Sequence, residues 1–244
     1  MNKMHKNILM FQHSDIVTPG YLLDLLKKDK MNFTTIRLDK NYKIPENLNE
    51  FDAMICLGGQ MNTNMESIYP WLIEEKRAIK KFVEVIKKPF LGICLGAQLL
   101  GEVIGGKVVQ TQPPEIGILD VKMSKNYNKD KVFKNFSSTF KVLQWHSYEV
   151  QDLELINEVV LLASSEHTKF QIFKYREYAY GIQFHTEIKE DTISNWAKIP
   201  ELKNVIEKNL GKDALYLFNI ECKKNINTLK KNTEKLYENF KNIL

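Results

Sequence analysis

The chain has 244 residues, of which 43% are hydrophobic and 27% are charged, a balance typical of one globular α/β domain. Its net charge of +5 comes from 35 basic and 30 acidic residues spread along the sequence, which argues against nucleic-acid binding through a charged tail. The three cysteines, Cys56, Cys94 and Cys222, are too far apart for a zinc site or a disulfide framework, so we expect no metal, no other cofactor and a reducing cytoplasmic location.

The first hundred residues alternate short apolar runs with amphipathic segments, the pattern of βαβ units in a parallel sheet. Strands are predicted at Ile8–Phe11, Phe33–Leu38, Ala53–Leu57 and Phe90–Ile93. Between them, Tyr21–Lys30 and Trp71–Ile86 carry apolar residues at spacings of three and four, which predicts surface helices. The first run is too short for a signal-peptide core and no run has the length of a membrane span, so we expect a protein that is neither secreted nor membrane-embedded.

Between residues 107 and 184 the pattern favours antiparallel strands and hairpins. The predicted strands are Ile118–Met123, Val159–Ala163, Phe170–Tyr175 and Tyr178–Phe184. After Glu187 the sequence is helical, and apolar residues recur at steps of three and four from Cys222 to Ile243. We expect this stripe to dock a long helix on the body, with a homodimer contact as the alternative.

The whole pattern predicts an α/β fold with a mostly parallel central sheet flanked by helices. A catalytic domain would span residues 1–190, with an added antiparallel region inside it. Residues 191–244 would form a helical extension packed on the same domain.

A sharp strand-to-helix turn is predicted after the fourth strand, where the sequence reads Gly92-Ile-Cys94-Leu-Gly96. Small residues flanking a central nucleophile are typical of a nucleophile elbow, because the turn has no room for larger side chains. A thiol there lies at a helix N-terminus, where the helix dipole favours the reactive thiolate, and the backbone amide of Leu95 would face a developing oxyanion. A structural core cysteine is the alternative for Cys94, and it is our prediction for the other two cysteines.

A cysteine nucleophile needs a base that a third group holds in place. His185 follows an apolar run and precedes Glu187, at a strand end where α/β sheets form their sites. His185 can therefore face Cys94 while Glu187 orients the imidazole, although a histidine and an acid at a strand end also occur without function. The histidines without a supporting neighbour are predicted at the surface or at sheet edges, and they are His5, His13 and His167.

These motifs together resemble the class I glutamine amidotransferase family, whose signature joins Gly-x-Cys-x-Gly-x-Gln after a strand with a distal His-x-Glu. Here the stretches read Gly92-Ile-Cys94-Leu-Gly96-Ala-Gln98 and His185-Thr-Glu187, and Gly58-Gly59-Gln-Met-Asn62 is a third match. Three motifs in the right order make the resemblance specific over residues 1 to 190, and it implies a flavodoxin-like three-layer fold. Thr186 and Gln60 replace prolines that are common in the family, which we expect to alter loop stiffness and not the chemistry.

The resemblance also implies a role for each site residue. Cys94 would form a γ-glutamyl thioester, His185 would pass a proton to the leaving ammonia, and Glu187 would orient His185. The amides of Gly59 and Leu95 would form the oxyanion hole. The implied substrate-binding positions are Gly58, Gln98 and the backbone at Ser147 and Tyr148. For Trp145 and His146 two interpretations stay open: a role in substrate binding, or a structural role as a core aromatic and a strand-edge histidine.

The stand-alone members of this family are similar to the glutaminase part of GMP synthase, so the first hypothesis is glutamine hydrolysis with ammonia delivered to a separate synthetase. The second is a γ-glutamyl peptidase or hydrolase that applies the same triad to γ-glutamyl peptides or conjugates. A non-catalytic module of the same fold would lack a nucleophile or a base. Related elbow-cysteine proteins would lack the distal His-x-Glu, so the sequence favours the first two hypotheses.

Overall fold

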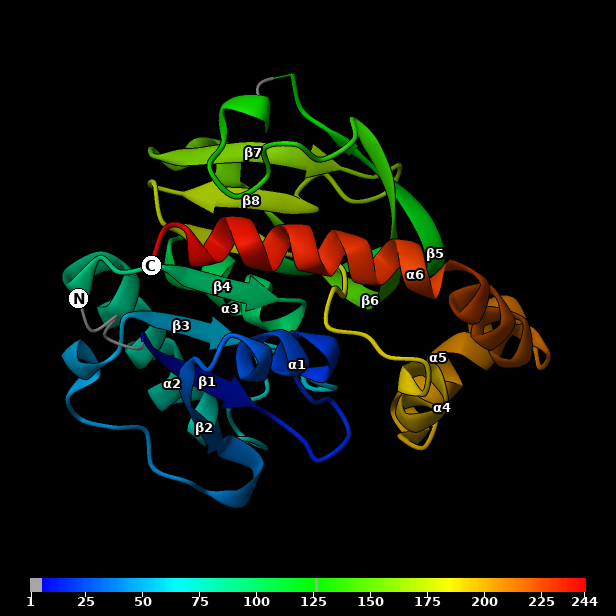
Figure 1. Cartoon of the computed structure of the whole chain (residues 1–244). Coiled ribbons are helices and arrows are strands. Elements are labelled where there is room, and N and C mark those ends of the chain that lie inside the picture. The colour runs from blue at the N-terminus through cyan, green and yellow to red at the C-terminus, as the bar shows by residue number, and fades with distance from the viewer. Residues whose placement is uncertain (1–5, 126) are drawn as a thin grey trace.

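The computed structural model describes residues 6–125 and 127–244, which fold around one mixed β-sheet (Figure 1). Within these residues, nine strands follow the order β2-β1-β3-β4-β9-β8-β7-β5-β6. The strands are β1 (Asn7–Gln12), β2 (Asn32–Arg37), β3 (Ala53–Cys56), β4 (Phe90–Ile93), β5 (Lys107–Met123), β6 (Thr139–Gln151), β7 (Val159–Ser164), β8 (Ile172–Tyr175) and β9 (Ala179–Ile182).

The sheet has a parallel half and an antiparallel half. Neighbours in the series β2-β1-β3-β4-β9 all pair in parallel, so their carboxyl ends meet at one edge of the sheet. From β9 onward, β8, β7, β5 and β6 pair in antiparallel fashion. The predicted parallel sheet with an added antiparallel region is therefore confirmed.

Helices cover both faces of the sheet, because alternate residues of each buried strand point to opposite sides. They are α1 (Gly20–Lys28), α2 (Trp71–Lys80), α3 (Leu95–Val103), α4 (Thr192–Trp196), α5 (Pro200–Leu210) and α6 (Ala214–Lys241). In β1, Ile8 and Met10 pack with residues of α1 and α6, whereas Leu9 and Phe11 pack with α2 and α3. Figure 1 shows α6 crossing one face of the sheet above α1.

The C-terminal helices dock on the hairpin of β5 and β6. A third apolar cluster joins Ile118 of β5 and Trp145 of β6 to Trp196 of α4, Ile206 of α5 and Phe218 of α6. The predicted stripe on α6 is buried inside the chain at Cys222, Ile226, Leu229, Thr233, Leu236 and Phe240. In the structure these positions face the body of the chain, and they offer no free surface to a second copy. No helix in the described part of the chain has the length and apolar character that crossing a membrane requires.

Several element boundaries differ from the predicted ones. The helix predicted at Trp71–Ile86 is α-helical only to Lys80, and Lys81–Ile86 forms a π-helical turn that buries Phe82 and Val83. Apolar spacing does not distinguish these two helix types.

The strand predicted at Ile118–Met123 is the second half of a longer β5, whose first half contains Pro113 and a break in register between Gln110 and Glu115. These irregularities obscure the strand pattern. The strand predicted at Tyr178–Phe184 ends at Ile182, because its partner β4 ends at Ile93 and the chain turns away at the next residue.

Candidate active site

The predicted elbow is present, and its backbone is strained at the nucleophile. Cys94 lies between β4 and α3 with φ 52° and ψ −105°. Residues other than glycine rarely adopt this backbone conformation. A Cβ atom at Gly92 would lie 2.4 Å from the carbonyl oxygen of Gly96, and one at Gly96 would lie 2.1 Å from that of Cys56. The turn therefore excludes any side chain at both flanking positions.

His185 and Glu187 form a buried pair after β9. His185 Nδ1 donates to Glu187 Oε1 at 2.7 Å, and the two residues are 5% and 1% exposed. The second carboxylate oxygen accepts from the backbone amide of Thr186 at 2.9 Å. At the start of α1, the amide of Tyr21 donates to the carbonyl oxygen of Glu187 at 2.7 Å. Because Nδ1 is bonded to Glu187, Nε2 is the ring nitrogen of His185 that can exchange a proton with the Cys94 sulfur.

Cys94 and His185 both lie beside Gly58. A Cβ atom at Gly58 would be 3.0 Å from His185 Cε1 and 3.5 Å from Cys94 Cβ, so both side chains flank the same glycine. Burial lowers the pKa of His185. The charges of Glu187 and Cys94 and the hydrogen bonds to both residues outweigh this effect and raise the pKa from 6.5 to about 10. The imidazole beside the sulfur is therefore a cation at neutral pH.

A cavity of about 260 Å³ opens onto the elbow. It is lined by five of the predicted site residues, Gly59, Cys94, Gln98, Ser147 and Tyr148. Glu201, Leu202 and Val205 of α5 form another part of its wall, so the C-terminal region contributes directly to the pocket. The remaining predicted residues, Gly58, Leu95, His185 and Glu187, do not line this cavity.

Gln98 is hydrogen-bonded to Tyr148, which lines the same cavity, and to Gln183. Its Nε2 atom donates to the carbonyl oxygen of Tyr148 at 2.9 Å and to Oε1 of Gln183 at 3.2 Å. Gln183 in turn places its Nε2 atom 3.7 Å from Cys94 Sγ. Gln98 is 4% exposed, so it is a fixed part of the pocket and not an ordinary surface residue of α3.

The predicted oxyanion-hole residues Gly59 and Leu95 are neighbours. A Cβ atom at Gly59 would lie 2.9 Å from Leu95 Cδ2, so the loop after β3 packs directly on the elbow. Leu95 is the first residue of α3, and amides in the first turn of a helix have no acceptor within the helix. Both backbone amides are thus close to Cys94.

Two residues at the site were not predicted from the sequence. Gln183 directly follows β9 and lies two positions before His185, and this two-residue spacing was the available signal. Trp196 of α4 meets the His185 ring edge-on, with centroids 4.4 Å apart. No sequence signal identified Trp196, because its contact depends on how the C-terminal helices dock.

The prediction for His13 at the surface or at a sheet edge is wrong. His13 is 0% exposed because α2 covers the end of β1, and its ring bonds to Glu75 of that helix and to the carbonyl of Gly58. His167 is exposed as expected, and His5 lies outside the described residues. His146 is buried in β6, with Nε2 3.2 Å from Glu115.

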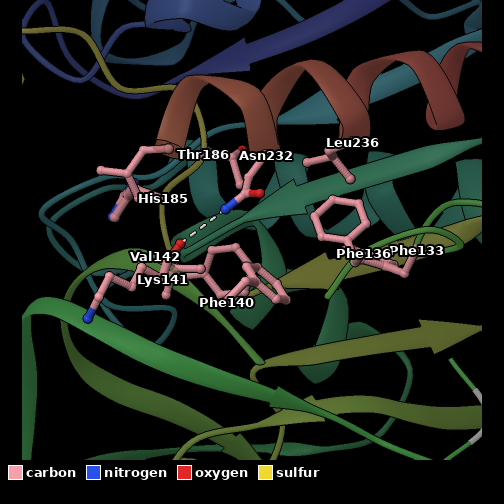
Figure 2. Close-up of a pocket in the computed structure, with 11 residues that line it drawn as sticks. Phe133, Phe136, Phe140, Lys141, Val142, His185, Thr186, Asn232 and Leu236 are labelled. Atoms are coloured by element: carbon pink, nitrogen blue, oxygen red, sulfur yellow. Dashed lines mark hydrogen bonds between the residues drawn. The ribbon is translucent and has the colours of Figure 1, made fainter. Parts of the chain in front are cut away.

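A second cavity is lined by His185 and Thr186 together with apolar side chains of β6 and α6 (Figure 2). Its volume is about 10 Å³, which is room for about one water molecule. The ring of Phe140 and the side chain of Leu236 are among those that fill this region. The cavity at Cys94, in contrast, has room for a small molecule.

Comparison with known proteins identifies relatives of this chain. Residues 20–195 match the family described as glutamine amidotransferase class-I. The chain is 30% identical to the glutamine amidotransferase-like protein YfeJ of Salmonella typhimurium, over 74% of this chain and 75% of that protein. It is also 30% identical to one subunit of the glutamine-hydrolyzing GMP synthase of Saccharolobus solfataricus, over 68% of this chain and 82% of that protein.

Solved structures show the same fold over nearly the whole chain. A glutamine amidotransferase from Thermotoga maritima superposes with a TM-score of 0.84 at 28% identity, covering 97% of this chain and 98% of the other. A second, from Methylobacillus flagellatus, has the same TM-score at 21% identity and covers 98% of this chain and 96% of its own. The fold, the matched family and these relatives agree, and the chain belongs to the class-I glutamine amidotransferase family.

Proposed function

We propose that the protein hydrolyses the side-chain amide of glutamine through a γ-glutamyl thioester on Cys94. The observation that carries the proposal is that Cys94 and the His185–Glu187 pair lie beside the same glycine, Gly58, next to a cavity of about 260 Å³. Family membership supports the same reaction. A non-catalytic module is disfavoured because nucleophile, base and orienting carboxylate are all present and adjacent.

In the first half of the reaction, the Cys94 sulfur attacks the γ-carbonyl carbon of glutamine. The negative charge that develops on the carbonyl oxygen would be stabilised by the amides of Gly59 and Leu95. His185, held as a cation by Glu187, gives its proton to the leaving nitrogen as the carbon–nitrogen bond breaks. Ammonia departs and the glutamyl group stays on sulfur as a thioester.

In the second half, a water molecule attacks the thioester carbon. His185, now neutral, accepts the proton of that water, and the carbon–sulfur bond breaks to release glutamate. Gln98, Ser147 and Tyr148 line the same cavity and would hold the amino-acid end of the substrate. Gln183 would stay beside the sulfur through both steps.

The ammonia is proposed to serve a separate synthetase, since the archaeal relative is named as one subunit of a glutamine-hydrolyzing GMP synthase. All three cysteines are free and buried, which suits a reducing compartment and a cytoplasmic location. Because the ammonia would be consumed by a separate synthetase, we expect weak basal turnover of glutamine by the isolated chain.

A γ-glutamyl peptidase is the second candidate, and one observation favours it. A cavity of about 430 Å³ adjoins the active-site cavity and shares Gln110, Ser147 and Val205 with it. The combined cleft has room for a γ-glutamyl conjugate larger than glutamine. The leaving group would then be an amino acid or a peptide in place of ammonia.

The test is to supply glutamine and a set of γ-glutamyl peptides to the purified protein and to identify the products by mass spectrometry. Cys94→Ala is expected to abolish turnover of every substrate while leaving the urea unfolding curve close to that of the wild type. Preference for glutamine would support the first candidate, and preference for peptides the second. Unchanged turnover by Cys94→Ala would refute both.

A further inference from the structure

A second histidine–carboxylate pair lies beneath the loop of residues 58–62. His13 and Glu75 are both 0% exposed, and His13 Nε2 is 2.8 Å from Glu75 Oε1. His13 Nδ1 is 2.9 Å from the carbonyl oxygen of Gly58. The Cys56 thiol donates to the same oxygen of Glu75 at 3.2 Å. The triad proposed for the reaction uses none of these three side chains.

The hydrogen bonds determine where the protons lie. A carbonyl oxygen only accepts, so His13 Nδ1 carries a proton and donates it to Gly58. Burial lowers the pKa of His13, but the charge of Glu75 and the hydrogen bonds to Glu75 and Gly58 raise it above its ordinary value. A buried ion pair is weak evidence for stability, because the desolvation of two charges offsets their attraction.

The contact with Gly58 constrains one peptide unit at the active site. The carbonyl of Gly58 and the amide of Gly59 belong to the same planar group, and in a trans peptide they point in opposite directions. Among the described residues, the cis peptide bond is Gln112–Pro113, so the Gly58–Gly59 bond is trans. Holding the carbonyl toward His13 therefore turns the amide of Gly59 away from His13. Gly59 lines the active-site cavity, whereas His13 has no exposed surface.

We infer that His13, held by Glu75, is a positioning residue that locks the Gly58–Gly59 peptide with its amide directed at the substrate oxyanion. Two consecutive glycines leave this peptide free to rotate unless a partner holds it. The pair thus supplies the preorganisation on which an oxyanion hole depends. The inference rests on the proposed function, since it assigns a role in the same acyl-transfer step.

A metal site is the competing explanation of this cluster. Ligand atoms of His13, Cys56 and Glu75 lie within 4.8 Å of one another. However, direct hydrogen bonds of 2.8 and 3.2 Å already join these atoms. Around a tetrahedral zinc ion they would be separated by roughly 3.3 Å or more. The geometry favours hydrogen bonding over metal coordination.

The test compares two variants that differ only in the donor at position 13. Both carry Glu75→Gln, which avoids leaving an unpaired buried carboxylate. His13→Asn retains a side-chain donor close to the place of Nδ1, whereas His13→Leu removes it. With glutamine and γ-glutamyl 4-nitroanilide as substrates, the leucine variant is expected to lose about 10- to 100-fold in kcat relative to the asparagine variant, with little change in KM.

Two further measurements separate positioning from loss of structure. Alkylation of Cys94 by iodoacetamide needs a reactive sulfur but no oxyanion hole, so its rate should be equal in both variants. Labelling glycine with carbonyl ¹³C and amide ¹⁵N gives NMR correlations only for consecutive glycines, Gly58–Gly59 and Gly105–Gly106. The first signal should move in the leucine variant and stay near its wild-type position in the asparagine variant. His167→Asn, at an exposed histidine, is the control.

The outcomes distinguish this inference from the proposed function. Equal kcat in the two variants, or an unmoved Gly58–Gly59 signal in the leucine variant, would overturn the positioning role. One equivalent of zinc in the wild-type protein that is lost on Cys56→Ser would also overturn it, in favour of metal binding. If the wild type turns over neither substrate, the proposed function fails, and the NMR signal alone decides whether His13 holds the peptide.

Discussion

His185 is held in its orientation by one short contact, the 2.7 Å hydrogen bond to Glu187. Glu187→Gln preserves the shape of the side chain but removes the charge that stabilises the imidazolium. We expect kcat to fall by roughly 100-fold or more, yet less than in Cys94→Ala, because an orienting group contributes less than the nucleophile. Steady-state kinetics on both variants check this order. Complete loss in Glu187→Gln with an intact fold would contradict it.

The charge on His185 also links stability to pH. Its pKa is raised from 6.5 to about 10 in the folded protein, so the folded state binds this proton more tightly than the unfolded chain does. The stabilisation is complete below pH 6.5 and is lost as the pH rises toward 10. We therefore expect the free energy of unfolding to fall over this window, and to fall less in Glu187→Gln. Urea titrations of the wild type and of Glu187→Gln at several pH values measure how the free energy of unfolding depends on pH in each protein. The same pH dependence in both proteins would contradict the prediction.

The elements around Cys94 leave no room for a side chain at either flanking glycine, Gly92 or Gly96. Because a Cβ atom at Gly96 would lie 2.1 Å from the carbonyl oxygen of Cys56, Gly96→Ala forces β3 and α3 apart. We expect a loss of about 2 kcal/mol or more in the free energy of unfolding, together with reduced turnover. Gly211→Ala is the matched control, because its Cβ meets no atom within 4 Å and carries only the cost of a φ of 91°.

Urea denaturation of the two alanine variants gives the comparison. A loss in Gly96→Ala well below about 2 kcal/mol would show that the elbow tolerates a side chain. That result would remove the steric explanation for the two flanking glycines.

The whole molecule depends on its C-terminal region, because residues after 190 both line the pocket and bury the third apolar cluster. Trp196 packs on His185, and Thr233 of α6 donates to the carbonyl of Thr186. We propose that residues 191–244 are an integral part of the catalytic domain. A chain truncated after Glu190 is expected to be inactive and to lose its cooperative unfolding transition.

Circular dichroism during urea titration and a turnover assay test this expectation. The control is the full chain cut at a protease site inserted in the exposed turn of residues 211–213, which leaves α6 docked on the body. A truncated chain that unfolds cooperatively and retains turnover would show that the extension is dispensable.

Local sequence patterns were sufficient to predict the parallel half of the sheet, the elbow at Cys94 and the pairing of His185 with Glu187. These features depend on local patterns: apolar runs of strand length, glycines flanking a nucleophile, and an acid two residues from a histidine. Each pattern describes contacts between residues near in sequence, or an order of motifs along the chain. The strand boundaries in β5 were missed because prolines and a break in register interrupt the local pattern.

The residues that surround Cys94 and His185 from distant parts of the chain could be identified only after the elements were seen packed together. His13 lies next to Glu75 because β1 and α2 meet beside the glycine loop, and Trp196 reaches His185 because α4 docks on β6. Gln98 and Gln183 meet because α3 begins where β9 ends. Such contacts follow from the way the elements pack. Packing is driven by the burial of apolar faces, and the polar residues that are brought together in this way carry no sequence motif of their own.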